Sequence, residues 1–508
     1  MKKEWNILRF IVTKLNRLTS FLKKNITVLN QNREGKYSAN VIALGACLLS
    51  LMLLIIMLFV PPVLGMSDDG SFSSRMNPAG IYHREDSSEN LYFNYYVKDY
   101  LSLAAEGSTL ANLTGQRILV FMAKWLDSFF TSDRTFDLRF LALLYGLLYI
   151  PAVFLLIKQG LQRVITFTES IVIGLTGIFI FADVSYLTYF SSFYTEPMVF
   201  ISLLFCTGAA LALQQKKRNL VYVILYSLFG VILTTIEVKY AVVGLILGIL
   251  GVKFIFLSKN LLWKICCCTA VLALFLSVMF SLRYSPASFN ESSKYHAMTR
   301  GVLLQSVDPE ETLKEFGIDS SYSILTDTNS NDQYPLLKPD NKDLNHGFYD
   351  KYNSAEIAYY YFKHPGSLVA MLDISVKATF NIRRDMSGNY EKSAGMPKMA
   401  KSILWSFWSR FKADTIPKTI GFLVVLLAAV ILLFRQKSPR LIRDYDPRGS
   451  IPLETMLAIF MIGISNAVIT IVNSGDTEMV RHLFLFSVSL DILIYFILAE
   501  LIHKLRIL

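Results

Sequence analysis

The chain has 508 residues, of which 53% are hydrophobic and only 18% are charged. A water-soluble domain is usually about 45–50% apolar and about 25% charged. The apolar residues concentrate in stretches of about 20, the length that crosses a bilayer core as a helix. The composition therefore excludes a water-soluble globular protein and predicts an all-α polytopic membrane protein.

Residues 1–40 combine basic charge with a helical spacing of apolar side chains. Apolar residues recur every three or four positions between Trp5 and Leu22, and Lys and Arg occupy positions between them. This pattern is typical of a basic helix on an anionic membrane surface, although a helix packed on the protein's own cytoplasmic loops would show it too. The segment is not expected to be a cleaved signal peptide, because it is too long and no small-residue cleavage motif follows it.

Ten apolar stretches are predicted to be membrane-spanning helices. They lie near residues 41–64, 136–157, 166–185, 197–214, 219–236, 240–257, 262–282, 417–434, 453–473 and 480–501. The segment 116–130 is too short and too charged to cross, and is predicted to be an amphipathic helix in the interface.

The spans predict four parts of the chain. These are a cytoplasmic segment 1–40, transmembrane helices 1–7 within 41–282 with a first outer loop 65–135, an extracytoplasmic lobe 283–416, and transmembrane helices 8–10 within 417–508.

Charge in the connecting loops predicts the orientation, because Lys and Arg in short loops stay cytoplasmic. With a cytoplasmic N-terminus, the loops on that side include KQGLQR, QQKKRN and RQKSPRLIRDYDPR, whereas the short outer connections carry only Lys239 and Arg481. Both termini are therefore predicted to be cytoplasmic, in a multi-pass protein of the plasma membrane. Because this topology accounts for the net charge of +11, a nucleic-acid partner is not expected.

In this orientation, charged motifs gather at the outer ends of the spans. They follow the first span, begin the fourth in YTEP, lie between the fifth and sixth, and begin the tenth. The residues concerned are Asp68, Asp69, Glu196, Glu237, Lys239, Arg481 and His482. Together they predict a polar cavity open to the outside, lined by carboxylates and by cations near the lipid headgroups.

Each motif also has a simpler structural explanation. Acids are common at helix ends in water, and Glu196 before Pro197 suits the first turn of a helix. Glu237 and Lys239 could pair in a tight turn. Arg481 could snorkel to the interface, although a charge at bilayer depth costs about 2.5–3.5 kcal/mol and usually faces a protein interior or a ligand. Three histidines are expected to be ordinary loop residues: His83, His296 and His364.

The order of these motifs resembles the GT-C class of integral-membrane glycosyltransferases, which includes protein O-mannosyltransferases, aminoarabinose transferases and oligosaccharyltransferases. The class is similar in carrying an acidic pair, two further residues and an aromatic residue soon after the first span. Here the pattern reads Asp68, Asp69, Gly70, Ser71 and Phe72, with Asp as the second acid where Glu is common. The segment 116–130, YTEP and the terminal RH also look like outer motifs of that class. The resemblance extends to bacterial hexosyltransferases of surface-glycan pathways and covers most of the membrane part, but not the 283–416 lobe.

The resemblance implies a GT-C-like fold and an inverting transfer of a monosaccharide. The donor would be a polyprenyl phosphate such as undecaprenyl phosphate, and the acceptor an extracytoplasmic hydroxyl of a cell-surface glycan or polymer. Asp68 would be the catalytic base, and Asp69 would orient it, bind the acceptor or bind a metal. Some class members require Mg²⁺ or Mn²⁺, and the resemblance leaves open whether this chain does.

The remaining motif residues would bind the substrates. Lys239 and Arg481, helped by His482, would stabilise the departing phosphate. Glu196 and Glu237 would orient hydroxyl groups of the donor or acceptor, and Tyr194 would also bind substrate.

Two other functions remain open from the sequence. A lipid-linked polysaccharide polymerase or ligase also has many spans, a large outer loop and outer arginines, but the acidic pair after the first span is not expected to be essential in it. A transporter usually places ionisable groups near the membrane midplane, in broken helices of two related halves. No related halves are found here, and the charges lie at span ends.

Overall fold

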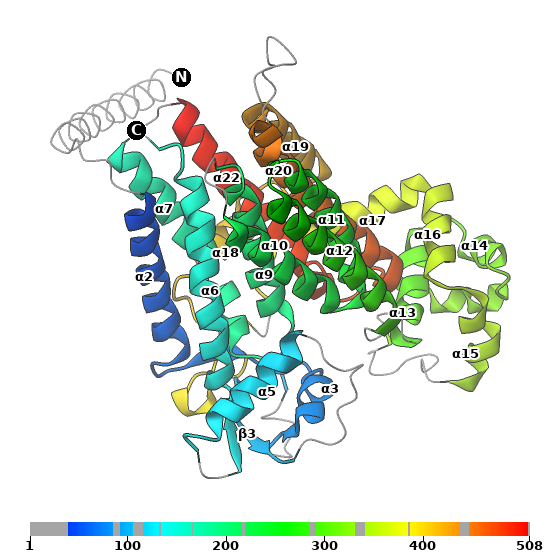
Figure 1. Ribbon diagram of the computed structural model, residues 1–508. Coiled ribbons are helices and arrows are strands. Elements are labelled where there is room, and N and C mark those ends of the chain that lie inside the picture. The colour runs from blue at the N-terminus through cyan, green and yellow to red at the C-terminus, as the bar shows by residue number, and fades with distance from the viewer. Residues whose placement is uncertain are drawn as a thin grey trace, which may run out of the picture.

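The computed structural model describes residues 39–84, 92–104, 115–131, 134–164, 166–215, 219–284, 291–330, 341–384, 387–435 and 447–505. Most of these residues are helical, and the long helices run side by side in one bundle (Figure 1). The basic helix predicted within residues 1–40 lies outside the described residues. Of this segment only residues 39 and 40 are described, and they begin α2 (Ala39–Leu58).

The long helices coincide with the predicted spans. Among the described residues, six helices are long and apolar enough to cross a membrane, and a pair bent by 46° passes as a seventh. These are α2, α6 (Arg139–Gly160), η4 with α11 (Val238–Ile255), α12 (Leu261–Tyr284), η11 with α20 (Pro447–Ser474), α22 (Phe484–Leu505), and the bent pair of α7 (Phe167–Phe181) and α8–η3 (Val184–Phe190). Three shorter apolar helices are α9 (Glu196–Ala212), α10 (Leu220–Thr235) and α19 (Ile420–Phe434). Each predicted span therefore matches a helix, and the polytopic all-α membrane fold is confirmed.

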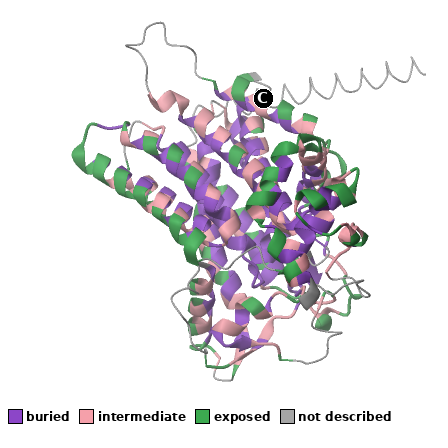
Figure 2. Cartoon of the chain, turned by 90° about the vertical axis from the view of Figure 1, so that its right-hand side faces the viewer, coloured by how far each residue is buried: buried purple, intermediate pink, exposed green. Residues whose placement is uncertain are grey.

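The helices approach closely where small residues face the contact. A Cβ atom at Gly463 of α20 would lie 2.4 Å from a ring carbon of Phe486 in α22, so only glycine allows this spacing. Small residues at such points let membrane helices pack by van der Waals contact. The outward faces remain apolar, as in Leu147, Ile249 and Leu432, and Figure 2 shows buried residues inside the bundle with exposed ones along its outer helices. These faces suit contact with lipid.

The break between α7 and α8 brings a buried segment to one end of the bundle. Asp183 accepts a hydrogen bond from the Ser185 backbone N–H (2.9 Å) and so caps α8. Its other oxygen accepts from the Ser409 backbone N–H (2.9 Å). Because this buried carboxylate is satisfied, the apolar helix can end inside the protein. The chain then continues through buried residues to Glu196, the first residue of α9.

Two small sheets lie at the end of the bundle where α2 ends and α9 begins, which we call the loop end. Strand β1 (Leu64–Met66) pairs antiparallel with β5 (Ser387–Tyr390). Strands β2 (Ile81–Tyr82), β3 (Asp99–Ser102) and β4 (Thr135–Asp137) form an antiparallel sheet in that order. Helix α5 (Gly115–Asp127) confirms the amphipathic helix predicted for 116–130, with Trp125 exposed. The sequence had predicted no strands here.

Short helices occupy the described part of the predicted 283–416 lobe. They are α13 (Glu291–His296), η5 (Ala297–Val302), η6 (Leu303–Gln305), α14 (Pro309–Glu315), η7 (Ser320–Leu325), α15 (Lys342–Gly347), η8 (Tyr349–Lys351), α16 (Ser354–Lys363), α17 (Pro365–Thr379), η9 (Lys392–Ala394) and α18 (Phe407–Asp414). Most of them lie to one side of the loop end (Figure 1). The division of the chain into four parts stays a prediction.

Unlike most of these short helices, α18 packs its side chains into the bundle. Lys412 Nζ lies 2.6 Å from Asp491 Oδ1 of α22, and neither side chain is exposed. The Trp408 indole N–H donates to the other oxygen of Asp491 (2.9 Å). This ion pair fixes the segment that follows β5 against the membrane helices.

The orientation of the bundle can be tested by cysteine labelling. With the five native cysteines replaced, Val307→Cys in the lobe should react with a membrane-impermeant maleimide on intact cells. Lys259→Cys, in the exposed connection between α11 and α12, should react only after the cells are opened. Labelling of Lys259→Cys alone on intact cells would reverse the predicted topology and place the loop end in the cytoplasm.

Candidate functional site

Asp68 and Asp69 lie in a tight turn between β1 and α3 (Ser73–Met76). Asp68 Oδ1 accepts hydrogen bonds from the backbone N–H groups of Gly70 (2.7 Å) and Phe72 (3.1 Å). Gly70 has a φ of +92°, a conformation that a residue with a side chain rarely adopts. The sequence DDGSF thus folds into a turn closed by its first carboxylate, and its second carboxylate contacts other elements.

Asp69 joins two arginines from distant parts of the chain. Its Oδ2 accepts hydrogen bonds from Arg384 (3.0 Å), which follows α17, and from Arg481 (3.3 Å) of α21 (Met479–His482). Its Oδ1 accepts from the Ser71 hydroxyl (2.6 Å). Burial raises the pKa of Asp69, but the two guanidiniums and the Ser71 hydroxyl hold that pKa well below its usual range. Asp69 is therefore ionised at neutral pH and is a poor proton acceptor.

The second oxygen of Asp68 faces a histidine. His83 Nε2 lies 3.1 Å from Asp68 Oδ2, without the alignment of a hydrogen bond. The Asp68 side chain is only 2% exposed, and Oδ2 accepts no hydrogen bond from the described residues. Buried carboxylate oxygens usually have a donor. His83 therefore contacts the site, whereas the sequence predicted an ordinary loop residue.

Three arginine guanidiniums surround the Tyr194 ring within the described part of the chain. The distances to the ring centroid are 5.9 Å for Arg75, 5.5 Å for Arg384 and 5.4 Å for Arg481. The ring is held in place because the Gln116 amide donates to the Tyr194 carbonyl (2.7 Å) and the tyrosine hydroxyl accepts from the Asp69 backbone N–H (3.2 Å). An aromatic face attracts guanidinium groups, so Tyr194 helps to assemble three like charges.

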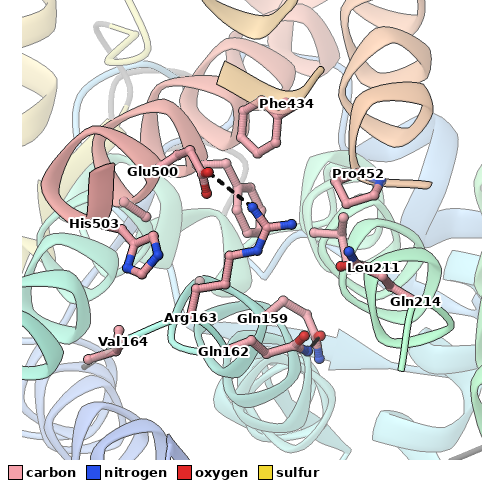
Figure 3. Close-up of a pocket in the computed structure, with 13 residues that line it drawn as sticks. Gln159, Gln162, Arg163, Val164, Leu211, Gln214, Phe434, Pro452, Glu500 and His503 are labelled. Carbon is pink, nitrogen blue, oxygen red and sulfur yellow. Dashed lines mark hydrogen bonds and ion pairs between the residues drawn. The ribbon is translucent and has the colours of Figure 1, made fainter. Parts of the chain in front are cut away.

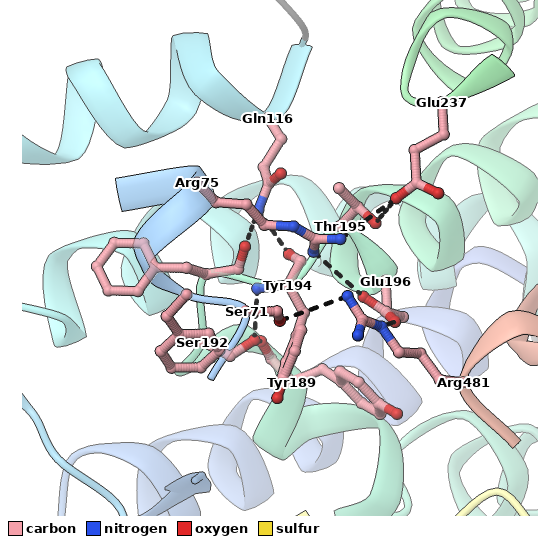
Figure 4. Close-up of polar contacts among 12 residues, drawn as sticks. Ser71, Arg75, Gln116, Tyr189, Ser192, Tyr194, Thr195, Glu196, Glu237 and Arg481 are labelled. Carbon is pink, nitrogen blue, oxygen red and sulfur yellow. Dashed lines mark hydrogen bonds and ion pairs between the residues drawn. The ribbon is translucent and has the colours of Figure 1, made fainter. Parts of the chain in front are cut away.

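Two glutamates form ion pairs with Arg75 and Arg481. Figure 4 shows Arg75 and Arg481 converging on Glu196, with nitrogen–oxygen distances of 4.0 Å and 3.8 Å. Glu237 lies 3.4 Å from Arg75 and 2.8 Å from Lys239. Burial alone would raise the pKa of Glu237. The positive charges of Lys239 and Arg75 lower it by more, so the pKa of this carboxyl lies well below its usual range. The result is a compact network of alternating charges at the loop end.

A family model described as the YfdI N-terminal transmembrane domain matches residues 23–508. The chain belongs to this family. Comparisons with curated proteins and with solved structures found no match. Membership in the YfdI N-terminal transmembrane domain family agrees with a membrane protein.

In this YfdI-family chain, the structure brings most of the motif residues together. Asp68, Asp69, Tyr194, Glu196, Glu237, Lys239 and Arg481 lie in the contacts described above. His482 follows Arg481, and burial and the nearby cations Lys239 and Arg481 lower its pKa well below the usual value. His482 is therefore neutral at pH 7 and does not add a positive charge. The predicted pairing of Glu237 with Lys239 is present.

Four residues of the site were missed in the sequence: Ser71, Arg75, His83 and Arg384. Arg75 follows the acidic pair closely, and its position one turn after Phe72 was a signal that could have been used. Arg384 lies in the polar lobe, where nothing distinguishes it from other loop cations. Asp476, an outer acid near Arg481, instead binds Arg300 through both oxygens (2.7 Å each).

A divalent cation does not fit the carboxylates of this YfdI-family site. Among the residues that the structure describes, no group of three or more His, Cys, Asp or Glu side chains could hold a metal ion. Both oxygens of Asp69, the predicted ligand, already accept hydrogen bonds, and two of the donors are guanidiniums that would repel a cation.

Proposed function

We propose that this YfdI-family protein is an inverting glycosyltransferase of the GT-C class. It moves a monosaccharide from a polyprenyl phosphate to an acceptor hydroxyl of an extracytoplasmic glycan or polymer. The observation that carries the proposal is a set of four buried polar atoms at the loop end that have no hydrogen-bond partner among the described residues. They are Asp68 Oδ2, Glu196 Oε2, Arg75 Nη1 and Arg384 Nη1.

These four atoms offer complementary chemistry to one ligand. Arg75 Nη1 and Glu196 Oε2 lie 4.0 Å apart as an ion pair, and Asp68 Oδ2 lies 3.1 Å from His83 Nε2, but none of the four atoms makes a hydrogen bond among the described residues. Buried polar groups without hydrogen bonds are costly, so a ligand that supplied these bonds would be favoured. The two guanidinium nitrogens can donate to phosphate oxygens, as Arg does in forked contacts. The two carboxylate oxygens can accept from hydroxyl groups. A sugar phosphate together with an acceptor hydroxyl carries both kinds of partner.

The proposed reaction is a single displacement. Asp68 Oδ2 accepts the proton of the acceptor hydroxyl while the hydroxyl oxygen attacks the anomeric carbon of the donor. The bond between that carbon and the phosphate oxygen breaks, and the polyprenyl phosphate leaves with the electron pair. Phosphate is a competent leaving group, so no strong acid is needed, and attack opposite the leaving group inverts the anomeric centre.

Three arginines stabilise the departing phosphate in this proposal. Asp69 holds Arg384 and Arg481, and Glu237 holds Arg75, so the cations are already in place before the donor binds. Preorganised charges of this kind stabilise a transition state without rearrangement. This differs from the assignment made from the sequence, because Lys239 is bound to Glu237 and now positions that carboxylate.

The proposal is tested by supplying the purified protein with defined donors. Polyprenyl-phosphate hexoses and aminopentoses are incubated with the reconstituted protein and with cell-wall glycan fractions, and donor consumption and glycosylated product are measured. We expect one polyprenyl-phosphate sugar to be consumed by the wild type and not by Asp68→Asn. Consumption of polyprenyl-diphosphate oligosaccharides instead would favour the polymerase or ligase alternative and refute this proposal.

A further inference from the structure

A polar cavity lies at the end of the bundle opposite the loop end, where α2 begins and α22 ends, which we call the terminal end (Figure 3). It is small, with a volume of about 40 Å³. The helices α6, α9, α19, α20 and α22 meet around it, and its lining includes Gln159, Arg163, Gln214, Phe434, Glu500 and His503. None of these residues takes part in the site at the loop end.

A cation and a carboxylate lie side by side in this cavity. Arg163 Nη1 donates to Glu500 Oε1 at 3.0 Å, and Figure 3 shows the guanidinium in the middle of the lining residues. The Arg163 side chain is 47% exposed, whereas that of Glu500 is 9% exposed. Lys504 Nζ lies 3.4 Å from the same carboxylate oxygen, and His503 lies beside Glu169 (3.0 Å). The described contacts of Arg163 use one nitrogen, which leaves its other donors for a ligand.

Gln159 contributes a buried donor that lacks an acceptor. Its side-chain oxygen accepts from the Gln162 amide, but its Nε2 is buried and makes no hydrogen bond with the described residues. The residue is 8% exposed and lines the cavity. Because buried amide groups are normally hydrogen-bonded, this donor indicates an acceptor oxygen supplied from outside the chain.

Apolar side chains also line the cavity, and the membrane-facing surface lies close to one of them. Phe434 and Phe496 line it, and Ile431, one helical turn before Phe434 on α19, is 41% exposed. The polar groups lie at the ends of α6 and α22, where a spanning helix reaches the level of the headgroups. A ligand with a polar head and an acyl chain would use both surfaces.

We propose that this cavity binds the headgroup of a phospholipid that carries both a phosphate and an amine, such as phosphatidylethanolamine. The phosphate binds Arg163 and Gln159, and the ammonium group binds the carboxylate of Glu500. Arg163 and Lys504 both contact Glu500 Oε1, so the ammonium group binds Glu500 Oε2, and a purely anionic headgroup has no cation to place there. A choline headgroup has no N–H to donate to that carboxylate. The proposal does not depend on glycosyl transfer at the loop end.

The test measures which lipids the full-length protein retains. The delipidated protein in mild detergent is given equal amounts of phosphatidylethanolamine, phosphatidylcholine and phosphatidylglycerol with identical acyl chains, and bound lipids are counted by native mass spectrometry. We expect phosphatidylethanolamine to be retained up to about fivefold over the others, the size of one partly exposed ion pair. Glycerophosphoethanolamine should displace it, and inorganic phosphate should not.

Variants separate the two halves of the headgroup. Glu500→Gln should lose the preference for phosphatidylethanolamine over phosphatidylglycerol, and Arg163→Gln should weaken retention of all three lipids. Arg163→Lys keeps the pair with Glu500 and should retain the preference, and it serves if Arg163→Gln does not fold. Lys259→Gln, at the same end but outside the cavity, is the matched control. Equal retention of the three lipids by the wild type, an unchanged preference in Glu500→Gln, or displacement by inorganic phosphate would overturn the proposal.

Discussion

Asp68→Asn should lower the rate of sugar transfer by about 10²–10⁴-fold, the usual loss when a general base is removed. The substitution keeps Oδ1, so the hydrogen bonds from Gly70 and Phe72 that close the turn can still form. It replaces Oδ2, the buried oxygen without a donor, by an amide that cannot take a proton. Apparent affinity for the donor should be unchanged, because the three arginines are untouched.

The measurement is the transfer rate against donor concentration, together with thermal unfolding in detergent. Asp69→Asn is the matched control, since it changes the neighbouring carboxylate that holds Arg384 and Arg481. It should weaken donor affinity more than turnover. Near-normal transfer in Asp68→Asn, with loss of turnover only in Asp69→Asn, would move the base by one residue.

Asp68→Ala should behave differently from Asp68→Asn. Asp68 is 3% exposed, and its Oδ1 accepts two backbone hydrogen bonds. Alanine leaves these backbone donors without an acceptor, so it is expected to lower the unfolding temperature, whereas asparagine is not.

The membrane helices could be predicted from the sequence because their signal is local. Each span is a continuous apolar stretch, and the structure has a helix at every one. The bend after Phe181 was harder to predict, because in the sequence Asp183 resembles the polar end of an ordinary span. Only the structure shows that its carboxylate accepts hydrogen bonds from Ser185 and Ser409 inside the protein. Hydropathy identifies which residues prefer lipid but carries no information about such polar contacts.

The small sheets could not be predicted for the same reason. Strand β1 has three residues and pairs with β5, more than 300 residues later in the chain, with Leu64 opposite Tyr390. Neither strand is long enough to show an alternating pattern. This pairing also brings the segment before β5, and with it Arg384, to Asp69. The sequence therefore indicated the acids of the site, whose motifs follow span ends, and missed the cation that a long-range strand pair delivers.

Arg481→Ala should raise the donor concentration needed for half-maximal transfer by about 10- to 100-fold, the effect of losing a hydrogen bond to a charged group. Arg481 lies 3.3 Å from Asp69 and 3.8 Å from Glu196, and its guanidinium contacts both carboxylates at once. The protein should still fold, because Asp69 keeps Arg384 and Glu196 keeps Arg75 as partners. No buried carboxylate is then left alone, which is the usual cause of large destabilisation.

Arg481→Lys should recover only part of the affinity, because an ammonium group is a point charge and cannot span both carboxylates while facing a phosphate. Arg300→Ala is the matched control. Arg300 is also an outer arginine bound to an acid, Asp476, but it lies outside the network around Tyr194. Its loss should leave donor affinity unchanged even if stability falls. If Arg481→Ala and Arg300→Ala affected donor use equally, Arg481 would be a structural ion-pair partner, and the phosphate would have to be assigned to Arg75 and Arg384 alone.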